Sequence, residues 1–309
     1  MKTVDLRFGD GYGPYMERLK ASRRAIARHE GCRADQITVT CGATGAIDLL
    51  FGALPKGSMI AAMPYEYYDI HVIAALHGHR TIRPPQSAAN SLDDFLRFVG
   101  ECKPQALYLS LPNNPLGTIY PSRDLKRLFA SLDADQLCII DQTLIAEKRL
   151  GVRWLGQAGA GKTVAVVRSF SKTHGAVVDR VGYVVMPCFP LDLHLFTHTP
   201  GISSLRKIQH LLEDKKTPAR LLERIQSNDR AIAAWAVGKK DLDWRSSRTN
   251  FGVLHTGERE NLEMALLGHD GVIINGAPHL SCPGNFIRIP LDVSPASIRR
   301  LLAVIDDAL

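Results

Sequence analysis

The segment that decides the fold is Arg168-Ser-Phe-Ser-Lys-Thr-His-Gly-Ala-Val-Val-Asp-Arg-Val-Gly182. It follows the apolar run Thr163–Val167, which predicts a short buried strand. Lys172 lies between small hydroxyl residues and a glycine, and Arg180 follows eight positions later. Lysine is seldom buried unless it is paired or reactive, and a lysine in a turn after a buried strand suits Schiff-base chemistry. Taken alone, the segment is equally compatible with an exposed lysine in a turn.

The composition is that of a globular protein without a membrane anchor. The chain has 309 residues, 45% of them hydrophobic, which is enough for one large domain or two modest ones. No apolar run reaches the roughly 18 residues of a membrane span, and residues 1–10 show no signal-peptide pattern. The six cysteines are scattered, with no CxxC pair and no histidine at metal-ligand spacing. We therefore expect a cytoplasmic protein with reduced cysteines, no metal site and no membrane contact.

The formal net charge of +7 raises the question of a nucleic-acid partner. The basic residues are dispersed, with small clusters only at Arg23-Arg24 and Lys215-Lys216. No basic stripe with interleaved aromatic residues is present. We therefore expect no nucleic-acid binding.

Strands and helices alternate along the first part of the chain. Buried strands are predicted at 36–40, 59–63, 80–83, 106–110, 137–140, 163–167 and 181–185, and helices at 15–30, 43–54, 69–78, 92–100 and 122–132. This pattern predicts a mostly parallel α/β sheet flanked by helices. From about Pro190 the pattern changes to helices at 205–235, 260–267 and 294–309 with strands at 249–255, 271–275 and 286–289. We predict a large domain at 31–189 and a smaller α+β domain made of 1–30 and 190–309.

Polar residues follow the predicted strands one after another. They are Gly42–Thr44, Tyr65–Tyr68, Asn113-Asn114, Asp141 and Lys172. Ligands of such sheets sit beyond the carboxyl ends of the strands. The small-residue turn at Gly42–Thr44 opens a helix, whose free N–H groups favour an anion. Together these residues predict a pocket for an anionic, aromatic and electrophilic ligand.

The segment Gly156-Gln-Ala-Gly-Ala-Gly-Lys-Thr163 matches the P-loop pattern letter for letter. A P-loop must follow a strand and open a helix, because the helix N-terminus holds the phosphates. Here the following run, Thr163–Val167, reads as a strand. We therefore interpret the segment as a turn without nucleotide-binding function.

The ordered motifs resemble the class I/II aminotransferases, the fold-type I family of pyridoxal 5′-phosphate (PLP) enzymes, and in particular its histidinol-phosphate aminotransferase-like branch. The resemblance covers roughly residues 10–309. It rests on Ser-Phe-Ser-Lys172 with Arg180, on Asn113-Asn-Pro-Leu-Gly117, on Gly42-Ala-Thr44, on Tyr65-Glu-Tyr-Tyr68, on Asp141 and on Ile287-Arg-Ile289. It implies a fold with a mostly parallel large-domain sheet and a smaller α+β C-terminal domain.

The resemblance implies roles at the cofactor's reactive centre. Lys172 would form the Schiff base with PLP and then shuttle a proton. Asp141 would bond the pyridine nitrogen and keep the ring protonated, so that the ring can accept electrons. Asn114 would donate to the ring's phenolic oxygen, and Tyr68 would stack on the ring face.

The resemblance also implies residues for the two anionic groups. The N–H groups of Ala43 and Thr44 would hold the cofactor phosphate, together with three side chains, Ser169, Ser171 and Arg180. Tyr12, with Tyr15 as its rival, stands where the family places a tyrosine that reaches the phosphate of a neighbouring subunit. Arg288 would bind the substrate α-carboxylate by a bidentate pair. A homodimer is implied as well.

The chain departs from the family pattern in three places. The usual Asp-Glu-Ala-Tyr is Asp141-Gln-Thr-Leu144, and Leu144 cannot donate the hydrogen bond that the family tyrosine gives to the cofactor. Val178 stands where the signature prefers Gly, Asn, Ala or Arg. The family's N-terminal arm is almost absent before Phe8. These departures leave the PLP site in place but make ordinary transamination less secure.

Three functions are consistent with these residues. The first is an aminotransferase that moves the amino group of an α-amino acid to a 2-oxo acid through a Lys172 Schiff base. The second is another PLP reaction on an amino acid, such as decarboxylation, β/γ-elimination or replacement, or cyclisation, in specialised metabolism. The third is a non-catalytic PLP-binding or regulatory protein; regulators of this fold carry an N-terminal DNA-binding domain, and only about ten residues precede the family match here.

Overall fold

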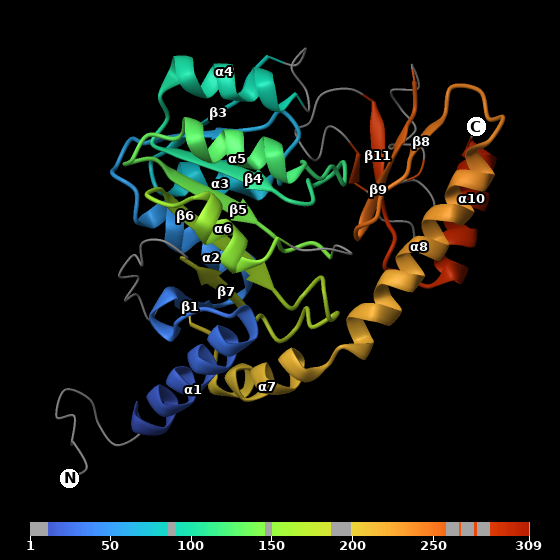
Figure 1. Ribbon diagram of the computed structural model, residues 1–309. Coiled ribbons are helices and arrows are strands. Elements are labelled where there is room, and N and C mark those ends of the chain that lie inside the picture. Colours follow the sequence, from blue (N-terminus) through green and yellow to red (C-terminus); the bar gives the residue numbers. More distant parts are fainter. Residues whose placement is uncertain are drawn as a thin grey trace, which may run out of the picture.

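Two β-sheets, each with its own helices, make up the part of the chain that the structure describes. The computed structural model describes residues 12–85, 91–145, 150–186, 199–257, 266, 275–276 and 285–308. Figure 1 shows the larger sheet with helices on both faces and the smaller sheet beside it. Over these residues no helix is both long and apolar enough to span a membrane.

The first sheet has seven strands in the order β1-β7-β6-β5-β4-β2-β3. Only β7 runs antiparallel to its neighbours. The predicted mostly parallel sheet is therefore confirmed. The strands are β1 (Ile37–Thr40), β2 (Met59–Ala62), β3 (Arg80–Ile82), β4 (Ala106–Ser110), β5 (Leu137–Asp141), β6 (Thr163–Ser169) and β7 (Gly182–Val185).

Helices cover both faces of this sheet because its strands are apolar on both sides. The strands β4 and β5 are buried at every position. On one face, residues such as Tyr108 and Ile139 pack against α2 (Gly42–Gly52) and α3 (Asp69–Leu76). On the other face the core includes residues of α1 (Tyr12–Glu30), α4 (Leu92–Cys102), α5 (Ser122–Ser131), α6 (Val152–Ala158) and α7 (Ile202–Glu213).

The packing of α1 differs from the predicted domain grouping. Leu19 and Ile26 of α1, and Leu205 and Ile208 of α7, belong to the core of the seven-stranded sheet. Residues 12–30 therefore pack with the large sheet, whereas the sequence predicts residues 1–30 in the small domain. The physical reason is that the apolar stripe of α1 finds its partners in β1 and α7.

The second sheet has four strands in the order β10-β11-β9-β8, all antiparallel. Its strands are β8 (Asp243–Arg245), β9 (Phe251–His255), β10 (Asn275–Gly276) and β11 (Phe286–Pro290). Its core includes Leu254 and Ile287, against which α8 (Lys216–Ala236) and α10 (Pro295–Ala308) contribute Ile232 and Ile305. The predicted smaller α+β part is present; the helix expected at 260–267 and the strand expected at 271–275 lie largely outside the described residues.

The helix predicted at 205–235 is two helices. α7 ends at Glu213, and the Asp214 carboxylate then accepts hydrogen bonds from the backbone N–H groups of Lys216 and Thr217, at 3.0 Å each. Such capping of exposed N–H groups starts a new helix. Periodicity alone cannot show the break, because both helices keep an apolar face.

The P-loop-like segment runs from a helix to a strand, which is the reverse of the order that a P-loop requires. The helix α6 contains its first residues, Gly161 has a φ of +77°, and β6 begins at its last residue, Thr163. No helix N-terminus therefore follows the segment, as expected for a turn.

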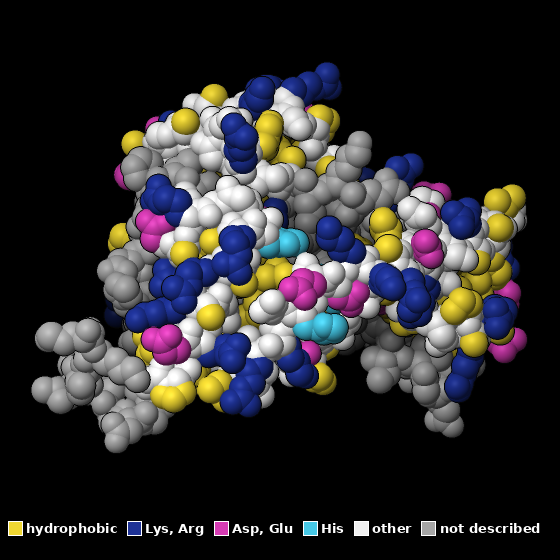
Figure 2. Space-filling model, turned by 60° about the horizontal axis from the view of Figure 1, so that its bottom comes forward, with side chains coloured by type: hydrophobic (Ala, Val, Ile, Leu, Met, Phe, Trp, Pro, Cys, Tyr) yellow, Lys and Arg dark blue, Asp and Glu magenta, His cyan; other side chains and the backbone are white. Residues whose placement is uncertain are grey.

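Over one face of the molecule, the lysine and arginine side chains are dispersed among acidic, histidine and apolar ones (Figure 2).

Candidate active site

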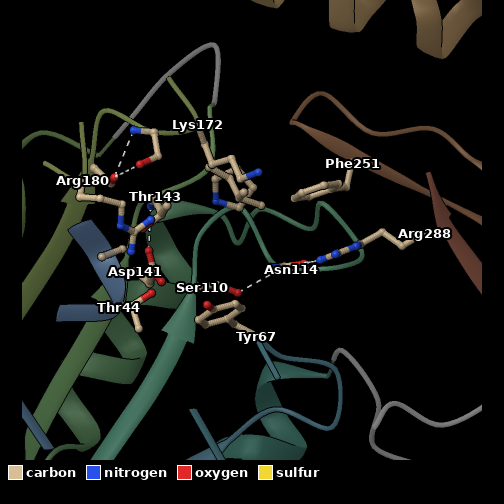
Figure 3. A pocket seen from close by; sticks show the side chains of 15 residues that line it. Thr44, Tyr67, Ser110, Asn114, Asp141, Thr143, Lys172, Arg180, Phe251 and Arg288 are labelled. Atoms are coloured by element: carbon tan, nitrogen blue, oxygen red, sulfur yellow. Dashed lines mark hydrogen bonds between the residues drawn. The ribbon is translucent and has the colours of Figure 1, made fainter. Parts of the chain in front are cut away.

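A cavity of about 280 Å³ opens at the carboxyl ends of the parallel strands, and it contains most of the predicted site residues. Parallel pairing sets Ser110 of β4 directly beside Asp141 of β5. The cavity also receives residues of the second sheet (Figure 3). Its lining consists of Ala43, Thr44, Tyr67, Ser110, Pro112, Asn114, Asp141, Thr143, Leu144, Ser169, Ser171, Lys172, Arg180, Phe251 and Arg288.

One end of the cavity has the features of an anion site. Gly42, with a φ of +75°, opens α2 and exposes the N–H groups of Ala43 and Thr44. A Cβ on Gly42 would lie 3.1 Å from Nη2 of Arg180, so the guanidinium packs against this turn. The hydroxyls of Ser169 and Ser171 lie at the same end, 3.1 Å apart. These groups can surround one phosphate with donors from three segments.

Lys172 lies in a short turn that hydrogen bonds hold together. The Ser171 N–H donates to Ser169 Oγ at 3.1 Å, and the Thr173 hydroxyl donates to the Ser169 carbonyl at 3.1 Å. From the second sheet, the buried Asn250 donates to the Lys172 carbonyl at 2.9 Å. The Lys172 Nζ itself lies 5.1 Å from the centroid of the Phe251 ring. The backbone of the turn is fixed, while the lysine side chain points into the cavity (Figure 3).

Asp141 is buried at the floor of the cavity and accepts a hydrogen bond on each carboxylate oxygen. The Thr143 N–H donates to Oδ1 at 2.7 Å, and the Tyr108 hydroxyl donates to Oδ2 at 2.5 Å. Hydrogen bonds to the charged form favour an ionised carboxylate despite burial. Asp141 can therefore present a fixed negative charge to a protonated nitrogen.

A second carboxyl, Glu66, lies behind the cavity and is buried. Burial raises the pKa of Glu66 to about 8, against the opposing effect of hydrogen bonds from the Ser110 side chain and backbone. Its oxygens accept from the N–H groups of Tyr67 and Ser110, both at 3.0 Å, and contact the Ser110 hydroxyl. Ser110 Oγ in turn accepts from the Asn114 N–H at 2.9 Å. Glu66 thus supports the loop that carries Asn114.

The opposite end of the cavity joins the two sheets. Arg288 of β11 donates from Nη1 to Asn114 Oδ1 at 2.9 Å. Its Cζ lies 4.2 Å from the centroid of the Phe251 ring, within the range of cation–π contact. Phe251 therefore lies between two cations, Lys172 and Arg288 (Figure 3).

The tyrosine that lines the cavity is Tyr67, and the structure does not bring Tyr68 into the lining. Tyr68 is the residue before α3, and its ring makes an edge contact with His71 at 6.2 Å. Because the chain is turning into a helix there, consecutive side chains point in different directions. Tyr67 is held by a hydrogen bond from its hydroxyl to Asp69. The prediction of Tyr68 therefore missed the cavity residue by one position.

The structure brings most of the other predicted site residues together in the cavity. Ala43, Thr44, Asn114, Asp141, Ser169, Ser171, Lys172, Arg180 and Arg288 all line the cavity. The side chain of Tyr12 lies outside what the structure describes; its rival, Tyr15, donates to the Pro200 carbonyl at 3.2 Å. Sequence reasoning missed Ser110, Thr143 and Phe251. Ser110 could have been found, because it is the last residue of a predicted strand.

The donor set fits PLP. Two segments with N–H or hydroxyl donors and a guanidinium suit its phosphate, Asp141 suits a protonated pyridine nitrogen, and Lys172 suits its aldehyde. The Thr143 hydroxyl lines the same cavity and is buried without a hydrogen-bond partner among the described residues. A buried hydroxyl of this kind ordinarily has a partner, and a bound ligand would supply one. Leu144 also lines the cavity and supplies no hydroxyl.

A mostly parallel α/β sheet with a lysine and an aspartate at its strand ends defines a fold-type I PLP enzyme. The sequence model of the aminotransferase class I and II family matches residues 10–305. The chain belongs to this family, and it is an enzyme whose cofactor is PLP.

The similar proteins carry the names of different reactions. The chain is 25% identical over 304 residues to a histidinol-phosphate aminotransferase of Akkermansia muciniphila, covering 93% of this chain and 79% of the relative. Its fold is similar to a histidinol-phosphate aminotransferase of Sinorhizobium meliloti in complex with PLP, with a TM-score of 0.79, 21% identity, and coverage of 94% and 83%. It is also similar to a decarboxylase of Sulfurospirillum multivorans, with a TM-score of 0.78, 18% identity, and coverage of 96% and 90%.

Proposed function

We propose that the protein is an aminotransferase that moves the amino group of an α-amino acid to a 2-oxo acid. The observation that carries this proposal is that Lys172, Asp141 and Arg288 line one cavity. Bound PLP supplies an electron sink for the electrons released at the substrate Cα. A lysine, an anion and an arginine in one cavity are the groups needed to move a proton, fix the ring charge and bind a carboxylate.

Each residue has a task that follows from its place. Lys172 holds the cofactor and moves a proton at the substrate Cα. Asp141 keeps the ring nitrogen protonated, and Tyr67 packs on the ring in the place predicted for Tyr68. Arg288 binds the substrate carboxylate, a task for which its planar fork is suited.

The phosphate binds at the anion end. Its donors are the N–H groups of Ala43 and Thr44, the hydroxyls of Ser169 and Ser171, and Arg180. Gly182 supports this site, because a Cβ there would lie 2.5 Å from the Gly42 backbone carbon. The strand β7 and the turn before α2 can approach so closely only with glycine at this position.

Decarboxylation is the second candidate, and the observation that favours it is Leu144. In the resembling family a tyrosine hydroxyl at this position bonds the cofactor, whereas here an apolar side chain lines the cavity. The hydrogen bonding to the cofactor's ring oxygen therefore differs from that in an aminotransferase that carries the tyrosine. The similar fold of a decarboxylase supports keeping this candidate.

We also propose that the active form is a homodimer in the cytoplasm. A dimer would bring a tyrosine such as Tyr12 to the phosphate of the neighbouring subunit. Light scattering on the purified protein measures the mass directly. A mass near twice the chain's 34.0 kDa is expected, and a monomer that is active at the same concentration would contradict the proposal.

One experiment separates the two reactions. The purified protein is mixed with added PLP, a panel of amino acids and 2-oxoglutarate, and products are identified by mass spectrometry. Transamination yields glutamate together with the 2-oxo acid of the donor amino acid. Release of CO₂ and an amine without glutamate would establish decarboxylation instead.

A further inference from the structure

Tyr108 is fully buried, yet its hydroxyl reaches the floor of the cavity. It lies on β4, two residues before Ser110, and its ring packs among the apolar residues beneath α2. The hydroxyl donates to Asp141 Oδ2 at 2.5 Å. Tyr108 does not line the cavity, so it acts on a ligand only through Asp141.

We propose that Tyr108 is a positioning residue that keeps Asp141 ionised and aimed at the ring nitrogen of PLP. The proposal rests on the assignment of Asp141 to that nitrogen. A phenol has one proton to donate, and here the acceptor is Asp141. With the Thr143 N–H on Oδ1, the two donors fix the plane of the carboxylate.

The surroundings of Asp141 make such a donor necessary. Asp141 is only 6% exposed, and burial disfavours the charged form of a carboxyl. Glu66 lies close enough for its own pKa to be raised by the charge of Asp141. The other titratable groups near Asp141 include Tyr67 and Tyr108, and Lys172 and Arg180 line the same cavity.

Burial also keeps Tyr108 in the donating form. It raises the pKa of Tyr108 well above its ordinary value, and the charges of Asp141 and Glu66 act in the same direction. The hydroxyl therefore stays protonated and available to donate to Asp141. Without it, the pKa of Asp141 would rise, and Asp141 would become neutral at a higher pH.

The chain provides a matched control in Tyr183 of β7. Tyr183 is 2% exposed, and its hydroxyl donates to Glu30 Oε1 at 2.6 Å. This pair joins a strand of the same sheet to α1 and lies on the opposite face, away from the cavity. Tyr183→Phe and Tyr108→Phe therefore each remove one buried hydroxyl that bonds a carboxylate, and each keeps the ring.

The experiment measures PLP binding by the two variants and the parent protein as a function of pH. Retention of PLP is followed by the visible absorbance of the holoenzyme, and the dissociation constant by equilibrium dialysis. For Tyr108→Phe we expect a roughly ten-fold weaker affinity, as for one lost hydrogen bond to a charged group. The pH at which PLP is lost on acidification should rise by about one unit.

Tyr183→Phe should leave both PLP affinity and this pH unchanged, although its melting temperature falls. The proposal is overturned if Tyr108→Phe matches the parent protein in affinity and pH dependence, or if both variants shift alike. A parent protein that binds no PLP would overturn the cofactor assignment itself, and the role of Tyr108 with it.

Discussion

The two ends of the cavity are built differently. At the cofactor end, the residues that surround Asp141 and the phosphate site come from strand ends and turns of one seven-stranded sheet. At the substrate end, Arg288 and Phe251 come from the second sheet and meet Asn114 from the first. Asp141 and the phosphate site are therefore fixed within one sheet, whereas the substrate end forms only where two sheets meet.

Because of this difference, we expect cofactor binding and substrate binding to depend on different parts of the molecule. Neighbouring parallel strands fix Asp141 through backbone register, so the cofactor end is expected to be rigid. The substrate end depends on side-chain contacts such as that between Arg288 and Asn114. Substitutions at the first end should change cofactor binding, and substitutions at the second should change substrate binding alone.

The largest effect is expected for Asp141→Asn. The amide keeps the size of the side chain but removes the charge that we assign to the ring nitrogen. Removing one partner of a buried ion pair costs roughly 3–5 kcal/mol, so kcat/KM should fall on the order of a hundred-fold to a thousand-fold. Steady-state kinetics and a PLP titration measure this. A loss of less than about three-fold would contradict the assigned role.

A smaller effect, confined to substrate binding, is expected for Arg288→Lys. Lysine cannot make the bidentate pair with a carboxylate, so KM should rise roughly ten-fold to a hundred-fold while PLP affinity stays the same. Arg245→Lys on β8 of the same sheet is the matched control, because Arg245 is exposed and makes a long hydrogen bond to Thr118, at 3.3 Å. If Arg288→Lys weakened PLP binding as much as substrate binding, the separation of the two ends would be wrong.

The smallest effect is expected for Glu66→Gln, and it appears in stability. Because the folded-state pKa of Glu66 is raised to about 8 from 4.5, the folded state binds more protons than the unfolded state between these values. Stability therefore falls as pH rises through this range. Glutamine does not titrate, but at every pH it leaves one backbone N–H without the carboxyl oxygen that accepts its hydrogen bond.

Thermal melting at pH 5 and pH 8 tests this sign. At each pH, the melting temperature of the parent protein is subtracted from that of Glu66→Gln. This difference should be at least about 2 °C higher at pH 8 than at pH 5. A difference between the two proteins that is the same at both pH values would show that Glu66 does not titrate in this range.

The sequence predicted the cofactor end better than the substrate end, for a physical reason. Strand periodicity and the rule that ligands bind at strand ends place Asp141 and Lys172 without knowledge of the second sheet. The resemblance added Arg288, but nothing in the spacing showed that Phe251 lies between it and Lys172. That contact joins two sheets, and periodicity carries no information on how they pack.

Local errors had local causes. Tyr68 was predicted in place of Tyr67 because a run of tyrosines does not show where α3 begins. The break between α7 and α8 depends on the side chain of Asp214, which caps the second helix. Tyr108 could not be predicted as a functional residue, because an aromatic residue inside a buried strand is ordinarily part of the core.

The central claim is that Lys172 holds the cofactor, and one measurement tests it most directly. The protein is loaded with PLP, reduced with borohydride, digested and examined by peptide mass spectrometry. The reduced cofactor is expected on the peptide that contains Lys172, and the visible absorbance should disappear on reduction. An adduct on another residue such as Lys162, or no adduct with PLP present in excess, would contradict the account.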